Sequence, residues 1–180
     1  TAESTTRHGK LLRVQTRPIH NRVLVEFIYD TAEAAGQNMV TIATDAACRW
    51  IMEQCGSRKP LRYLLESNFS GDKNPTQRTM TEGRGHHVIC SFSVPDRLLR
   101  KLLRVSVDDI VCRITDKQLG SQMAGVFGLN LHVSNALAAS YLALGQDVAC
   151  VAENCVGTTT YENQGDNLYA TLSMPSITVG

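Results

Sequence analysis

The chain has 180 residues, of which 43% are hydrophobic, and its formal net charge is +1 at pH 7. This length supports one domain or two small ones, and this composition excludes an intrinsically disordered chain. The near-neutral charge argues against nucleic acid as the main partner, because proteins that bind phosphate backbones carry a clear basic excess.

The first third of the chain predicts a small layer of strands and one helix. Residues 10–16 and 22–29 have the alternating pattern of two strands, joined by a turn at 18–21. The period then changes, because the apolar residues of 34–54 fall on one helical stripe. Residues 61–66, LRYLLE, are interpreted as another strand. The order strand, strand, helix, strand indicates an α+β layer.

The remainder of the chain begins with a loop at residues 70–76, SGDKNPT, whose composition is typical of loops. Residues 86–94 alternate as in a strand. Pro95 opens a predicted helix with leucines on one side and a basic face on the other, which we interpret as solvated surface. Residues 119–144 are apolar nearly all round and predict one buried central helix that ends at Gly145.

The cysteines and histidines show neither a disulfide framework nor the spacing of metal ligands. No C-x-x-C pair occurs and most cysteines lie inside apolar runs, so we expect reduced core residues of a cytoplasmic protein. We also predict no structural metal. The residues concerned are Cys48, Cys55, Cys90, Cys112, Cys150, Cys155, His8, His20, His86, His87 and His132.

No targeting or membrane segment is expected from these residues. The sequence begins TAESTTRHGK and has no apolar stretch after its charge, unlike a signal peptide. It also has no run of about 20 apolar residues, so we expect no membrane contact within this segment. These residues leave open whether a membrane anchor lies outside the segment.

Four polar features stand out from this scaffold. Lys73 follows Asp72 in the loop, and Asp147 directly follows the long apolar segment. Residues 33–39, EAAGQNM, begin the first predicted helix. Their glycine allows close backbone approach, and a helix N-terminus attracts anions.

The fourth feature is the pair His132 and Asn135, which share a helix face at spacing i, i+3. Each feature also has a simpler structural interpretation. A single loop lysine is usually solvated, a His–Asn pair in a buried helix is usually structural, and Asp147 could be a turn residue. Composition and pattern alone therefore indicate an α+β domain with a candidate small-molecule site.

Seven motifs in one order carry a resemblance to a known family. They are EAAGQNM, SGDKNPT, TEGRG, GSQMAG, LNLHVSNALAA, LALGQD and MPSI. Their order resembles the catalytic portion of 3-hydroxy-3-methylglutaryl-CoA (HMG-CoA) reductase. The resemblance runs from STTR at 4–7 to MPSITVG at 174–180, nearly the whole chain. It implies reduction of the HMG-CoA thioester to mevalonate by two successive hydride transfers from a nicotinamide cofactor.

The resemblance implies that Lys73 and Asp147 are catalytic. Lys73 matches the family's catalytic lysine, and Asp147 matches the aspartate beside it. Carbonyl reduction builds negative charge on oxygen, which a fixed cation stabilises. A carboxylate next to that cation would hold it in place and keep it protonated.

By the same resemblance, further residues bind the substrate and the cofactor. The residues near the HMG group are Asp72, Asn74, His132 and Asn135. The cofactor residues are Thr6, Arg7, Glu33, Gly36, Gln37, Asn38 and Met39. Arg7 matches an arginine that contacts the 2′-phosphate of NADPH, and an arginine fork suits that group, so we favour NADPH over NADH.

Several residues depart from the family's pattern, and among them Ala34, Ala35 and Gln37 replace bulkier neighbours. Glu33 stands where the family has aspartate, and Asn74 stands where many members have a second lysine. Glu66 falls where a serine touches the HMG carboxylate, which an acid would repel. The resemblance further implies that the family's catalytic glutamate and an HMG-binding arginine precede Thr1, and that its catalytic histidine follows Gly180.

The prediction is therefore an α+β segment of an HMG-CoA reductase. Residues 1–66 form a ferredoxin-like NADP-binding subdomain, and residues 67–180 form part of a larger helical substrate-binding domain. Since the family builds its active site between two subunits, we expect a homodimer or higher oligomer. Two alternatives stay open, namely a catalytically inactive regulatory or ligand-binding homologue, which Glu66 and Asn74 favour, and a truncated product.

Overall fold

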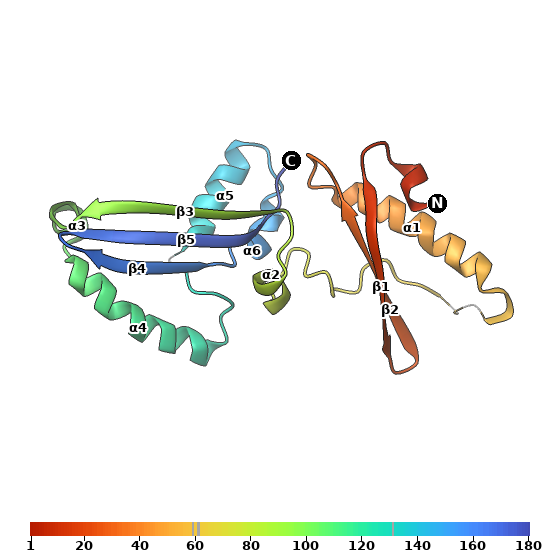
Figure 1. The fold of residues 1–180 in the computed structure, drawn as a ribbon, viewed down its shortest axis with the longest axis horizontal. Helices are drawn as coiled ribbons and strands as arrows, with labels where there is room; N and C mark the ends of the chain where they lie inside the picture. Colours follow the sequence, from red (N-terminus) through yellow and green to blue (C-terminus); the bar gives the residue numbers. More distant parts are fainter. Residues whose placement is uncertain (59, 61, 131) are drawn as a thin grey trace. The chain divides into compact units, whose positions relative to one another are not determined.

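The computed structural model describes residues 1–58, 60, 62–130 and 132–180, and it divides into two compact units (Figure 1). The first unit comprises Thr1–Phe69 with Gly180, and the second comprises Ser70–Val179. Each unit contains one antiparallel sheet and helices, so the fold class is α+β. The assignment of cofactor binding to 1–66 and substrate binding to 67–180 stays a prediction.

The first unit is a β-hairpin beside one long helix. Strands β1 (Lys10–Ile19) and β2 (Arg22–Asp30) pair antiparallel, and His20 adopts a left-handed φ of 53° in the turn between them. Helix α1 (Gln37–Gln54) follows, and a short 3₁₀-helix, η1 (Ala2–Thr5), precedes the hairpin. The predicted strand, strand, helix order is confirmed, although α1 begins three residues later than expected.

The core of this unit is built from small residues. Ala2 of η1 packs against Ala43 and Ala47 of α1, and partly buried side chains of the hairpin complete the cluster. Alanines allow η1 and α1 to approach closely, whereas larger side chains at these positions would hold them apart. The packing therefore fixes the N-terminal segment against the central part of α1.

The strand predicted at 61–66 is wrong for residues 62–66, which belong to no strand; residue 61 lies outside the described residues. The apolar side chains matched a strand pattern, but a strand also needs a partner to satisfy its backbone groups. Leu64 is 80% exposed, so the alternation of this stretch does not correspond to a buried face.

The second unit contains a three-stranded antiparallel sheet of order β3-β5-β4 (Figure 1). Its strands are β3 (His86–Pro95), β4 (Thr158–Gln164) and β5 (Asn167–Ile177). The predicted strand at 86–94 and the helix opening at Pro95 are confirmed, the latter as α3 (Asp96–Leu103). Leu99 of α3 is buried, while the outer leucines of this helix are exposed.

Helix α4 (Val107–Ala124) runs along the sheet beside β4 (Figure 1). Ser106 caps it, because the Ser106 hydroxyl accepts from the backbone N–H of Asp109 while the Asp109 carboxylate accepts from the Ser106 N–H. Side chains of α3, α4 and the sheet pack together in one cluster. Its members are Leu99, Val107 and Leu168, with Val94, Ile110, Val111 and Tyr161 packed against them.

The single central helix predicted at 119–144 is wrong, because the chain breaks into α4 and α5 (Val133–Ala143). Gly125 ends α4 with a left-handed φ of 69°, and Gly128 has a φ of 80°. A Cβ at Gly128 would lie 2.3 Å from the carbonyl oxygen of Gly157, so the glycine permits a close backbone crossing. Met123 is 91% exposed, so the end of α4 is not a buried core helix.

Short helices complete the second unit and position the candidate site. They are α2 (Gln77–Thr81), the 3₁₀-helix η3 (Val148–Cys150) and α6 (Val151–Asn154), which packs against β5. The first unit also has a one-turn 3₁₀-helix, η2 (Gly56–Arg58). α5 ends at Ala143, and Gly145 follows with a left-handed φ of 67°, close to the predicted end.

The cysteines differ from expectation in their burial. Within the described residues no disulfide joins them, and Cys150 is buried, but Cys90 and Cys112 are exposed. The prediction of core cysteines is therefore wrong for these two, because their runs supply exposed faces of β3 and α4. Over the part of the chain that the structure describes, no helix is long and apolar enough to cross a membrane. No group of three or more potential metal ligands occurs among the same residues.

Candidate functional site

Lys73 lies in a tight turn that opens the second unit. The backbone N–H of Asn74 donates to the carbonyl oxygen of Gly71 at 3.0 Å, and the Asn74 side-chain amide donates to the carbonyl oxygen of Asp72 at 2.8 Å. Lys73 has a left-handed φ of 58°. This conformation costs a non-glycine residue about 1–2 kcal/mol, so neighbouring contacts must hold the turn.

The turn is anchored on both sides. Before it, the hydroxyl of Ser70 accepts from the backbone N–H of Asp72 at 3.1 Å. After it, Thr76 caps α2 by accepting from the backbone N–H of Thr79 at 3.0 Å. The loop chemistry seen in the sequence therefore produces a defined turn that presents the Lys73 side chain.

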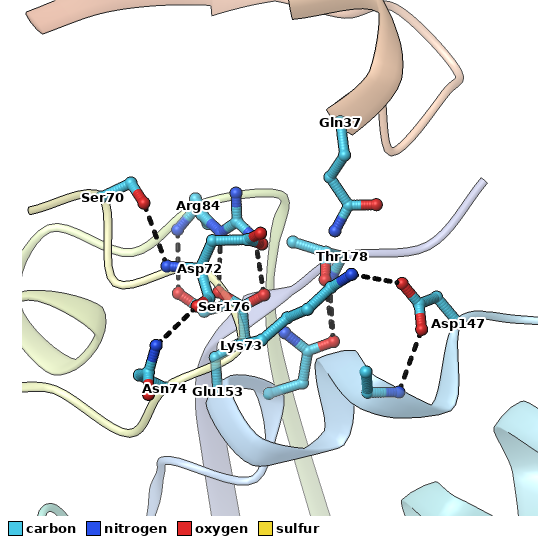
Figure 2. Close-up of polar contacts among 12 residues, drawn as sticks. Gln37, Ser70, Asp72, Lys73, Asn74, Arg84, Asp147, Glu153, Ser176 and Thr178 are labelled. Atoms are coloured by element: carbon cyan, nitrogen blue, oxygen red, sulfur yellow. Dashed lines mark hydrogen bonds and ion pairs between the residues drawn. The ribbon is translucent and has the colours of Figure 1, made fainter. Parts of the chain in front are cut away.

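The side chains of Lys73 and Asp147 form an ion pair, with 3.0 Å between Nζ and Oδ2 (Figure 2). The other carboxylate oxygen of Asp147 accepts from the backbone N–H of Ala149 at 3.0 Å and so caps η3. Asp147 is thus both a turn residue and the partner of Lys73. The side chains of Lys73 and Asp147 are 42% and 44% exposed, which leaves the ammonium accessible to a ligand.

Each member of this pair shifts the pKa of the other toward its charged form. The hydrogen bond and the charge of Asp147 raise the pKa of Lys73, with smaller contributions from Asp72 and Cys150. The hydrogen bond from Lys73 lowers the pKa of Asp147, and the N–H of Ala149 acts in the same direction. Lys73 is therefore a protonated, positioned cation at neutral pH.

Arg84, in the turn TEGRG, joins this site although the sequence assigned it no role. Its Nε and Nη2 donate to the two carboxylate oxygens of Glu153 at 2.6 and 2.5 Å, and Nη2 also donates to Asp72 (Figure 2). Burial alone would lower the pKa of Arg84, but the two acids raise it. The signal in the sequence was the polar pair Glu153–Asn154 within the otherwise apolar run VACVAENCV.

A second buried polar group connects α6 to β5. Asn154 Oδ1 accepts from the hydroxyl of Tyr141 at 2.6 Å, and from the hydroxyl and backbone N–H of Thr178 at 2.9 and 3.2 Å. Asn154 is fully buried, and its Nδ2 has no hydrogen-bond partner among the described residues. These contacts tie α5 and α6 to Thr178, which directly follows β5.

His132 and Asn135 lie at the start of α5 rather than inside a continuous helix. His132 is the N-cap with a left-handed φ of 61°, and its carbonyl oxygen accepts from the backbone N–H of Asn135 at 3.3 Å. Both side chains are exposed. Among the described residues, neither side chain takes part in the polar network around Lys73.

The predicted cofactor residues lie in the first unit, around the N-terminus of α1. Gly36 is the N-cap with a left-handed φ of 78°, and a Cβ there would lie 2.4 Å from Cγ2 of Thr31. No side chain caps this terminus and no acidic residue occupies its first turn, which contains Gln37, Asn38 and Met39. An anionic group fits such a terminus.

The N-terminal segment meets the same helix end. The hydroxyl of Thr6 donates to the sulfur of Met39 at 2.9 Å and accepts from the backbone N–H of Gly9 at 3.0 Å. Arg7 and Glu33 are exposed. The structure thus brings Thr6 and Met39 together, and it leaves Arg7 next to Thr6 in the chain with its side chain in solvent.

Comparison with known proteins identifies a family that the whole chain matches. Residues 1–180 match the family model described as hydroxymethylglutaryl-coenzyme A reductase. The 3-hydroxy-3-methylglutaryl-coenzyme A reductase of Haloferax volcanii is 38% identical over 180 residues, covering 99% of this chain and 44% of the relative.

Other relatives give the same result. The reductase of Methanothermobacter thermautotrophicus is 35% identical over 178 residues, which cover 98% of this chain and 44% of the relative. Reductase 1 of Candida albicans is 33% identical over 181 residues, which cover 98% of this chain and 17% of the relative. The chain therefore spans less than half the length of these relatives.

Proposed function

Because this chain belongs to the hydroxymethylglutaryl-coenzyme A reductase family, we propose that it supplies the oxyanion-stabilising part of a reductase that converts HMG-CoA into mevalonate. The observation that carries this proposal is the ion pair between Lys73 and Asp147, at 3.0 Å. It places a protonated, half-exposed ammonium on a turn whose conformation is held by other contacts.

The chemistry follows from this placement. The nicotinamide cofactor, when bound, supplies the hydride that adds to the carbonyl carbon of the thioester. Negative charge then develops on the carbonyl oxygen, and the Nζ–H groups of Lys73 donate hydrogen bonds to it. Asp147 holds the ammonium in position and keeps it charged. The hemithioacetal formed in this step breaks its C–S bond to give the aldehyde and the CoA thiolate, and the resemblance assigns protonation of that thiolate to the family's catalytic histidine. The second hydride transfer, to the aldehyde carbonyl, needs the same cation.

For the substrate, we assign Asp72, Asn74, His132 and Asn135 to the neighbourhood of the HMG group. Arg84 shares its positive charge between Asp72 and Glu153, and this partly offsets the repulsion between Asp72 and the HMG carboxylate. Asn74 replaces a cation with an amide that already donates to the turn. Substrate affinity should therefore depend more strongly on Lys73 than in relatives with two adjacent lysines.

For the cofactor, we assign residues 1–66 to an NADP-binding part of a ferredoxin-like subdomain. The uncapped N-terminus of α1 at Gly36 would receive a phosphate, and exposed Arg7 would pair with the 2′-phosphate of NADPH. We further propose that the functional unit is a homodimer or higher oligomer, with the site completed at a subunit interface.

The test is an assay of the complete product of the gene that encodes this chain. Oxidation of NADPH with HMG-CoA is compared between the natural protein, a Lys73→Ala variant and a Lys101→Ala variant, the control being an exposed lysine of α3. Turnover that Lys73→Ala abolishes and Lys101→Ala retains is the expected result. Equal turnover in all three would contradict the proposal, and no turnover in the natural protein would favour a regulatory or ligand-binding homologue.

A further inference from the structure

We propose that Arg84 is a positioning residue for Lys73: its guanidinium ties the turn that carries Lys73 to the buried carboxylate of Glu153. We call the contacts of Arg84 with Asp72 and Glu153 the clamp. The inference rests on the proposed function, because it assigns the clamp a role in the same reaction. It concerns a residue that acts through Lys73 rather than one that touches the substrate.

The geometry of Arg84 is that of a bridge between two acids. It forms a two-point contact with Glu153, at 2.6 and 2.5 Å, and the same Nη2 reaches the carboxylate of Asp72 (Figure 2). The side chain of Glu153 is 1% exposed, whereas those of Asp72 and Arg84 are 29% and 32% exposed. One end of the bridge is therefore rigidly buried, and the other end holds a loop.

The backbone of Arg84 is fixed as firmly as its side chain. The hydroxyl of the buried Ser176 accepts from the Arg84 backbone N–H at 2.8 Å and donates to the carbonyl oxygen of Thr79 at 3.3 Å. A Cβ at Gly83 would lie 2.4 Å from the carbonyl oxygen of Pro175, and a Cβ at Gly85 would lie 2.3 Å from that of Ile177; both carbonyls belong to β5. The two glycines thus allow the turn to lie directly against β5, which aims the guanidinium.

The contact matters for Lys73 because Asp72 and Lys73 are the two central residues of one turn. Lys73 has a left-handed backbone, and such a conformation persists only where the surroundings hold it. Arg84 holds the side chain of Asp72, while Asn74 and Ser70 hold the backbone on either side of it. Without the guanidinium, the turn loses the ion-pair link that joins Asp72 through Arg84 to Glu153 of α6.

The consequence for chemistry is positional. Lys73 meets Asp147, and Asp147 caps η3, which leads directly into α6 and Glu153. The positions of both Lys73 and Asp147 therefore depend on one short stretch of chain, residues 147–153. Displacing the turn by about 1 Å would misplace the cation and cost up to about 100-fold in rate.

The experiment uses the complete gene product and avoids stranding a buried charge. Arg84→Met alone would leave Glu153 buried and unpaired, and such a protein could fail to fold. The double variant Arg84→Met with Glu153→Met replaces the pair with apolar side chains of similar volume, which such sites tolerate. It leaves Asp72 at a position where solvent can reach it.

Two readouts separate positioning from a merely structural role. The first is steady-state kinetics, in which kcat should fall about 10- to 100-fold while the KM for the nicotinamide cofactor stays unchanged. The second is the rate of reductive methylation of Lys73, measured by mass spectrometry against Lys101 in the same sample. This rate should rise several-fold in the double variant, because an ammonium released from Asp147 loses its proton more readily.

The outcomes distinguish the two proposals. If Lys73→Ala abolishes turnover but the double variant keeps its kcat, the clamp is overturned and the proposed function stands. If turnover does not depend on Lys73, the proposed function fails, and the methylation rate alone decides whether Arg84 positions Lys73. An unchanged methylation rate in a folded double variant overturns the clamp in either case.

Discussion

The ammonium of Lys73 lies 3.0 Å from the carboxylate of Asp147, and that same carboxylate caps the 3₁₀-helix that leads into α6. The pair therefore connects a strained turn to a helix end. Its two residues lie far apart in the sequence, so their contact is a tertiary one. Both side chains remain partly exposed, so the pair itself contributes little to stability, and its ammonium stays accessible from solvent.

Asp147→Asn should lower kcat by about 10- to 1,000-fold with little effect on the melting temperature. The asparagine oxygen can still accept from the N–H of Ala149 and cap η3, but it cannot hold the Lys73 ammonium by charge. Kinetics with HMG-CoA and thermal unfolding of the same samples measure the two effects. The matched control is Asp116→Asn, which changes an exposed acid of α4 and should leave kcat unaltered.

The pH dependence of the pair follows from the opposite shifts of its members. The pKa of Asp147 is lowered, so its contribution to folding stability is present above the usual carboxyl pKa and is lost as pH falls through the lowered value. The pKa of Lys73 is raised, so its contribution to folding stability is present below the usual ammonium pKa and is lost as pH rises through the raised value.

The resulting expectation is an alkaline limb in kcat/KM that depends on Asp147. Asp147→Asn should move that limb to lower pH, because the main cause of the raised pKa of Lys73 is removed; Asp72 and Cys150, which also face the ammonium, contribute less. A profile with the limb at the same pH in the natural protein and the variant would show that Lys73 does not carry it.

Arg7→Ala should raise the KM for NADPH by about 10- to 100-fold and leave the KM for NADH nearly unchanged. The reason is that only NADPH has the 2′-phosphate with which the exposed guanidinium would pair. Arg13→Ala, an exposed arginine of β1, is the control and should change neither constant. A parallel rise for both cofactors would place Arg7 elsewhere on the cofactor or show a general structural effect.

Gly128→Ala and Gly120→Ala should change stability in opposite directions. A Cβ at Gly128 would meet the backbone oxygen of Gly157 at 2.3 Å, and its φ of 80° disfavours alanine, so the free energy of unfolding should fall by at least about 1–2 kcal/mol. Gly120 lies inside α4 with nothing within 4 Å of an added Cβ, so alanine should raise stability by about 0.5–1 kcal/mol. Chemical denaturation of both variants measures the difference. A continuous helix over 119–144 would instead be stabilised by alanine at both positions.

Elements with a regular local pattern were predictable. The alternation at 22–29, the helical stripe at 34–54 and the amphipathic helix after Pro95 each reflect a period that one segment imposes by itself. The failures occurred where local pattern and tertiary context disagree. Residues 62–66 are apolar yet have no strand partner, and the apolar segment 119–144 breaks where the backbone of Gly128 crosses that of Gly157.

The sequence by itself determined the hairpin, α1, β3, α3 and the loop that presents Lys73, because periodicity and turn chemistry act over a few neighbouring residues. The order of its motifs also pointed to Lys73 and Asp147. Only the tertiary structure decided that Arg84 lies between Asp72 and Glu153. Burial of Glu153 and the bridge to Asp72 depend on packing α6 against β5, and no local pattern encodes a contact between such distant segments.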